Sequence, residues 1–137
     1  MTESDRTSFQ EITLTLLRIV AALAFMTHGL PKLLGLLGGF GPEGGTASFM
    51  SRFWIAGLLE TVGGLLLALG LFTRPVAFIL SGQMAVAYFW IHVPGDGLWW
   101  WNNGGELAMI FSFIWLFFSA WGAGKYSLDA KIASRRS

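Results

Sequence analysis

The segment FWIAGLLETVGGLLLALGLF, residues 53–72, decides the fold of this chain. Its 20 residues match the length of α-helix that crosses the roughly 30 Å hydrocarbon core of a bilayer. It carries a single ionisable side chain, Glu60. Because a charge at the bilayer centre costs roughly 2.5–3.5 kcal/mol on insertion scales, the segment is predicted to be a transmembrane helix whose carboxylate faces protein.

The composition extends this prediction to the whole chain. The 137 residues are 54% hydrophobic and 12% charged, with a mean hydropathy of +0.60. A soluble domain is about a quarter charged, so an integral membrane protein surrounded by lipid is expected. The net charge of +1 gives no electrostatic case for nucleic acid as a partner. The chain has no cysteine, which excludes disulfides, thiol relays and cysteine-ligated clusters within it.

Three further apolar segments accompany the segment 53–72. No small-residue cleavage site follows the first of them, so it is expected to remain as an anchor and not to be removed as a signal peptide. The prediction is an all-α, single-domain protein, residues 1–137, folded as a compact bundle of four transmembrane helices. Their expected ranges are 12–37, 53–72, 76–93 and 104–121, followed by a short tail, 122–137.

Basic residues predict the orientation of these helices. They gather on the side that holds both termini, and the opposite side carries only Arg52 and the deeper Lys32. By the positive-inside rule, both termini are expected in the cytoplasm. The tryptophans near the opposite side, among them the run 99–101, are expected to anchor the outer interface. The basic residues on the cytoplasmic side are Arg6, Arg74, Lys125, Lys131, Arg135 and Arg136.

Ionisable residues within the apolar segments are the candidate functional residues. His28 and Lys32 are four residues apart on the first helix and therefore share a face. Glu60 is expected to pair with Arg18, His28 or Lys32, or else to be protonated. Two interpretations stay open, a packing lock between the first two helices and a site for a proton or a substrate. Arg18 and Lys32 can also extend to the membrane interfaces, whereas the shorter His28 side chain cannot.

The third and fourth helices add polar candidates. Met84, Tyr88 and His92 are spaced by four and are expected to share a face, either as core or as the wall of a cavity suited to a flat ring. Asn103 is expected to cap the fourth helix, with Glu106 as the capping-box carboxylate. Glu106 is also expected near the outer ends of the first two helices, so it joins the candidates.

A set of short motifs resembles the DoxX family of small bacterial membrane proteins. The resemblance covers about residues 17–130, and it implies a four-helix bundle in the bacterial inner membrane and an association with redox chemistry. In the namesake relatives the protein is a subunit of a thiosulfate:quinone oxidoreductase. The motifs, in order, are Arg18…His28-Gly29…Lys32, Glu60-Thr61-Val62-Gly63-Gly64, Gly70-Leu71-Phe72-Thr73-Arg74, Asn103-Gly104-Gly105-Glu106 and Gly122-Ala123-Gly124…Ser127-Leu128-Asp129.

The resemblance leads to two main expectations about function. The first is a non-catalytic accessory subunit that stabilises a larger redox, respiratory or photosynthetic membrane complex, or a homo-oligomer, through helix packing and buried ion pairs. The second is a quinone-reactive subunit with a proton site at Glu60 or His28 and no cofactor in the chain other than quinone. Its electrons would come from a partner, because the chain has no flavin, haem or cluster motif. Whether the protein is an enzyme stays open.

A small transporter with an anion path from Arg18 to Lys32 is a minor alternative. No metal site is expected. The candidate ligand-binding residues are Arg18, His28, Lys32, Glu60, Tyr88 and Glu106.

Overall fold

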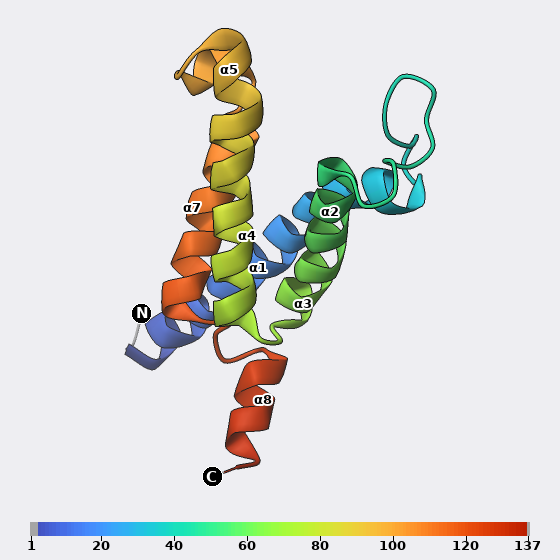
Figure 1. The fold of residues 1–137 in the computed structure, drawn as a ribbon. Helices are drawn as coiled ribbons and strands as arrows, with labels where there is room; N and C mark the ends of the chain where they lie inside the picture. Colours follow the sequence, from blue (N-terminus) through green and yellow to red (C-terminus); the bar gives the residue numbers. More distant parts are fainter. Residues whose placement is uncertain (1–2, 137) are drawn as a thin grey trace.

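The computed structural model of the chain describes residues 3–136, and every regular element in that range is helical (Figure 1). The all-α prediction is therefore confirmed for these residues. Residues 1, 2 and 137, which the predicted domain 1–137 includes, lie outside them. The elements are α1 Glu3–Leu34, α2 Arg52–Leu58, η1 Leu59–Gly63, α3 Gly64–Leu69, α4 Thr73–Ala87, η2 Tyr88–His92, α5 Val93–Asp96, α6 Trp100–Asn103, α7 Glu106–Trp121 and α8 Leu128–Ser134.

Within residues 3–136, three continuous helical stretches are long and apolar enough to cross a membrane: Thr7–Leu34, Arg52–Leu69 and Thr73–Asp96. The first span was predicted to end at residue 37, but α1 ends at Leu34. Gly35 ends the helix there, because its φ of +68° is left-handed. The fourth apolar helix, α7, has 16 residues. At 1.5 Å per residue it rises about 24 Å, which is less than the hydrocarbon thickness of a typical bilayer.

Two of the long stretches contain a π-helical turn, which the sequence did not predict. η1 joins α2 to α3, and η2 joins α4 to α5. A π turn inserts one residue into a helix and is frequent at functional sites. Each of these turns rotates the residues that follow it relative to the faces expected from a regular helix.

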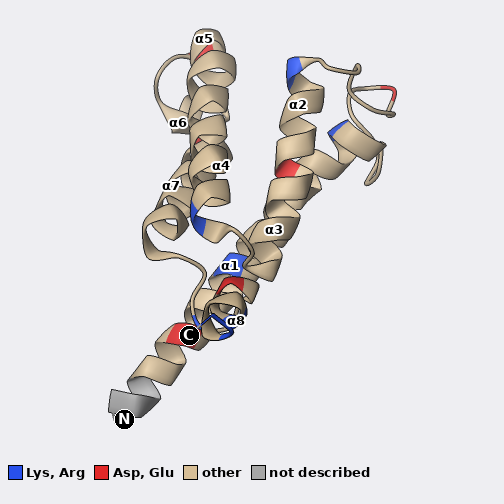
Figure 2. Cartoon of the chain, turned by 60° about the horizontal axis from the view of Figure 1, so that its bottom comes forward, with Lys and Arg blue, Asp and Glu red and all other residues tan. Residues whose placement is uncertain are grey.

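The helices form two antiparallel pairs that meet at one end and diverge at the other (Figures 1 and 2). In one pair α1 packs along α2, η1 and α3, and in the other α4 packs against α7. We call the end at residues 70–72 and 122–127, where the pairs meet, the base, and the end at α2 and α5 the open end. The bundle is thus helical but less compact than predicted.

The core explains why the pairs meet where they do. Phe25 of α1 stacks edge-on against Trp115 of α7, with ring centroids 5.4 Å apart, and both side chains are buried. Gly63 faces α4 so closely that an added Cβ would lie 2.8 Å from Leu80 Cδ1. Large apolar side chains such as Phe78 and Phe113 remain exposed on the outer faces, as lipid contact requires.

The segment after α7 is tied back to the base. The Asp129 carboxylate accepts hydrogen bonds from the backbone N–H groups of Phe72, at 2.8 Å, and Thr73, at 2.9 Å. It therefore caps the start of α4 from a distant part of the chain. Most of the basic residues lie toward this same end (Figure 2).

Candidate functional site

An ion pair between α1 and η1 forms the centre of the candidate site. Lys32 Nζ lies 2.7 Å from Glu60 Oε2 and 3.0 Å from Glu60 Oε1. Glu60 is 2% exposed, and Gln83 Nε2 of α4 donates a hydrogen bond to its Oε1 at 3.2 Å. The expected pairing of Glu60 with a basic residue is confirmed, and Lys32 is the partner.

Glycines allow the two helices to approach closely enough for this pair. A Cβ added to Gly57 of α2 would lie 2.7 Å from Lys32 Cβ, and one added to Gly29 of α1 would lie 2.8 Å from the Gly57 carbonyl oxygen. The backbones of α1 and α2 are therefore almost in contact beside the ion pair. Helices in lipid use small residues in this way, because close backbone approach increases van der Waals contact.

A cavity of about 210 Å³ borders the pair on the side of α7. Its polar lining consists of His28, Lys32, Glu60 and His92, and its apolar lining includes the rings of Phe25 and Phe111. The His28 imidazole is edge-on to the Phe111 ring, with centroids 6.2 Å apart. His92 Nδ1 lies 3.1 Å from the Asn103 carbonyl oxygen, which fixes the orientation of that imidazole.

A second cavity, of about 430 Å³, borders the same pair on the side of α2 and α4. It shares Lys32, Glu60, Ala87 and His92 with the first, and most of its remaining walls are apolar. The ion pair thus lies between two cavities at the open end. We call the first the ring cavity, because the rings of Phe25 and Phe111 line it, and the second the lateral cavity.

Arg18 was predicted to join this site, and the structure places it at the base instead. Its side chain is 1% exposed and donates hydrogen bonds to the carbonyl oxygens of Ala123 and Tyr126, the latter at 2.9 Å. Ten residues separate Arg18 from His28, which is almost three turns along α1. Arg18 therefore holds the C-terminal segment and does not reach Glu60.

Tyr88 lies outside the two cavities and is buried in the core together with Met84, which agrees with the core alternative for this face. η2 runs from Tyr88 to His92, so its wider turn changes the spacing between these two residues, whereas the Tyr88 N–H still bonds to the Met84 carbonyl oxygen as in a regular α-helix. Met84 and His92 line the ring cavity, whereas the Tyr88 hydroxyl donates a hydrogen bond to the Leu98 carbonyl oxygen.

Glu106 starts α7 but makes no capping box, so that prediction is wrong. The residue before it, Gly105, is the N-cap, and no side chain caps this end of α7. Asn103 instead accepts a hydrogen bond from the Gly105 N–H at 2.8 Å and donates one to the Gly97 carbonyl oxygen at 2.9 Å. Glu106 is exposed and lines neither the ring cavity nor the lateral cavity.

Two residues that the candidate list omitted belong to the site. Gln83 contacts Glu60, and His92 lines both cavities. An amide or an imidazole inside an apolar span itself indicates a polar partner within the protein, because an unpartnered polar group in lipid is costly.

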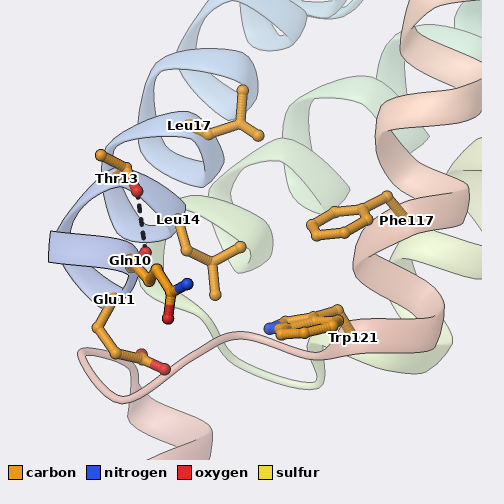
Figure 3. A pocket seen from close by; sticks show the side chains of 7 residues that line it. All are labelled: Gln10, Glu11, Thr13, Leu14, Leu17, Phe117 and Trp121. Atoms are coloured by element: carbon orange, nitrogen blue, oxygen red, sulfur yellow. Dashed lines mark hydrogen bonds between the residues drawn. The ribbon is translucent and has the colours of Figure 1, made fainter. Parts of the chain in front are cut away.

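A separate cavity of about 520 Å³ lies near the base between α1 and α7 (Figure 3). The side chains of Thr13 and Glu11 in its lining already have hydrogen-bond partners within the chain. Thr13 Oγ1 donates to the carbonyl oxygens of Phe9 and Gln10, and Glu11 Oε2 accepts from the Lys125 N–H at 2.6 Å. The open end, with its buried ion pair and two histidines, is therefore the stronger candidate.

Comparison with known proteins points to one family. A family model described as DoxX matches residues 13–93, a range that contains Lys32, Glu60, Gln83 and His92. An uncharacterized protein of Haemophilus influenzae is 46% identical over 124 residues, which cover 86% of this chain and 89% of the relative. No solved structure matches the chain significantly.

Proposed function

Because the chain belongs to the DoxX family, we propose that it is a membrane subunit that binds the ring of a lipid-soluble quinone beside Lys32 and Glu60. The observation that carries this proposal is the position of the ion pair between two cavities with largely apolar walls. An ion pair that only held two helices together is expected to be packed closely by side chains, without a cavity on each side.

The residues of the ring cavity fit such a ring. At about 210 Å³ the cavity is smaller than the roughly 300–1,000 Å³ of sites for drug-sized ligands, so it suits a single ring. Phe25 and Phe111 supply apolar and aromatic contact. The ammonium of Lys32 and the imidazole of His28 are donors suited to carbonyl oxygens.

A bound quinone would supply an acceptor for two electrons and two protons. In this proposal Lys32 orients the ring, and Glu60 and His28 hold and move the protons at their carboxylate and imidazole. Both groups serve as general acids and bases in other proteins. The electrons come from a redox centre in a partner subunit.

The proposal includes a topology. Four spans cross the bacterial inner membrane, with α7 as the fourth, and both termini lie in the cytoplasm. The clustering of Lys and Arg toward the base supports this orientation. The open end and its ion pair then lie in the outer half of the bilayer.

Equilibrium binding of a soluble, tail-less benzoquinone to the purified protein tests the proposal. Glu60→Gln keeps the shape of the side chain but removes its charge, and should weaken binding by about tenfold or more, as loss of a charged partner does. Glu106→Gln makes the same change outside both cavities and should bind like the natural protein. Equal affinities in all three proteins would overturn the proposal.

An accessory role is the second candidate, favoured by a specific observation. Aromatic side chains such as Phe78, Phe89 and Phe113 are exposed on the outer faces of α4, η2 and α7, where a partner helix can pack. In this case Glu60→Gln should change the size or thermal stability of the complex isolated in mild detergent, with the partner's own chemistry unchanged. An unaltered complex would count against this role.

A further inference from the structure

We propose that the lateral cavity holds the apolar tail of the ligand whose ring lies beside Lys32 and Glu60. The ligand is then an amphiphile with a polar ring and an apolar tail, and it enters sideways from the bilayer. A water-soluble ring without a tail would fill only the ring cavity. This inference rests on the proposed function, and it adds the place of the ligand's tail and the route by which the ligand enters.

The four residues that line both cavities are the first observation. Lys32, Glu60, Ala87 and His92 line both, so a ligand that contacts the ion pair in the ring cavity already borders the lateral cavity. The lateral cavity is about twice as large, at about 430 against 210 Å³. It has room for a flexible chain.

The mouth of the lateral cavity faces lipid. Ile55 of α2 is 42% exposed and Val86 of α4 is 48% exposed, and both line this cavity. They belong to the two helix pairs that diverge toward the open end (Figure 1). An apolar chain can therefore pass between the pairs without displacing the core.

The order of polarity along the cavity matches a polar ring with an apolar tail. Its inner end is polar, with Glu60, Lys32 and the Gln83 amide, whereas Ile55 and Val86 at the mouth are apolar. An anionic lipid would bind in the opposite sense, with its headgroup at Arg52, whose guanidinium is 5.0 Å from the Phe53 ring centroid. The polar groups of Glu60, Lys32 and Gln83 would then face an acyl chain, which offers them no hydrogen bond. A ligand with a polar ring and an apolar tail is therefore favoured over an anionic lipid.

Photo-crosslinking in phosphatidylcholine nanodiscs tests the inference on the full chain. The probe is a benzoquinone with a decyl tail that ends in a diazirine, and the reference is the same diazirine alkane without the ring. The inference predicts labelling of residues 55–59 and 86–91 enriched about tenfold over the reference, because the ring anchors the tail. Label spread over the outer faces, as for the reference probe, would overturn it.

Two variants sharpen this test. Val86→Trp narrows the mouth and should reduce labelling several-fold while tail-less benzoquinone still binds. Leu65→Trp adds the same bulk at a residue that is 50% exposed on α3 and lines neither cavity, and it should change nothing. Equal labelling of the natural protein and Val86→Trp would contradict the inference.

Competition distinguishes failure of the tail inference from failure of the proposed function. If tail-less benzoquinone removes the label and Glu60→Gln abolishes it, but the label is spread, only the tail placement is wrong. If neither has an effect, the ring site itself is wrong. Displacement of the label by phosphatidylglycerol, but not by the tail-less ring, would assign the lateral cavity to an anionic lipid and overturn the inference.

Discussion

The Lys32 ammonium and the Glu60 carboxylate, 28 residues apart in sequence, lie 2.7 Å apart between two cavities. The pair joins α1 to η1 at the point where the backbones of α1 and α2 are closest. It is therefore both a structural link within one helix pair and the polar centre of the proposed site. The two roles predict different effects of substitution.

Lys32→Met should destabilise the protein, because it leaves a buried carboxylate with Gln83 as its remaining side-chain donor. Loss of one partner of a buried pair costs about 3–5 kcal/mol, and the 20% exposure of Lys32 places the expected loss near the lower value. Combining Lys32→Met with Glu60→Gln should recover part of that loss. Unfolding in detergent measures it, and simple additivity of the two changes would show that the pair is not coupled.

Gly57→Ala should destabilise the contact between α1 and α2. The added Cβ would lie 2.7 Å from Lys32 Cβ, so the helices must separate, at a cost of about 1–3 kcal/mol. The matched control is Gly82→Ala, where an added Cβ meets nothing within 4 Å. There, higher helix propensity should stabilise by about 0.5–1 kcal/mol. The same unfolding measurement compares them, and similar losses at both glycines would disprove the close-approach argument.

Arg18→Lys should loosen the C-terminal segment. The guanidinium donates to two carbonyl oxygens, at Ala123 and Tyr126, and a single ammonium cannot reproduce that planar fork. Trypsin should then cleave after Lys125 several times faster than in the natural protein. Arg52→Lys, an exposed change at the opposite end, serves as the control, and unchanged cleavage in Arg18→Lys would contradict the assignment.

The absence of native cysteine allows a direct test of the topology. Single substitutions Ser48→Cys and Ala133→Cys place thiols at exposed residues on the two proposed sides of the membrane. A membrane-impermeant thiol reagent added to intact cells should label Ser48→Cys alone, and Ala133→Cys only after permeabilisation. The reverse pattern would invert the orientation, and labelling of both would remove α7 as the fourth span.

The sequence predicts the helices and the Glu60 pairing because both follow from the cost of polar groups in lipid. The length of each apolar run sets a helix, and a lone carboxylate within one requires a partner. The sequence also placed His28 and Lys32 on one face of α1, and both line the ring cavity.

The errors have separate physical causes. η2 changes the spacing between Tyr88 and His92, and no single-sequence pattern predicts a π turn. Glu106 fits a capping box by spacing, but Asn103 uses its side chain to close the loop before α7. The divergence of the two helix pairs depends on long-range packing, which short-range periodicity does not contain.

The most direct test of the account is a nuclear Overhauser measurement on the protein in nanodiscs with bound tail-less benzoquinone. The account predicts contacts from the ring protons of the benzoquinone to the His28 imidazole and the Phe111 ring, lost in Glu60→Gln and retained in Glu106→Gln. Ring contacts confined to the outer faces, for example to Phe78 or Phe113, would contradict it.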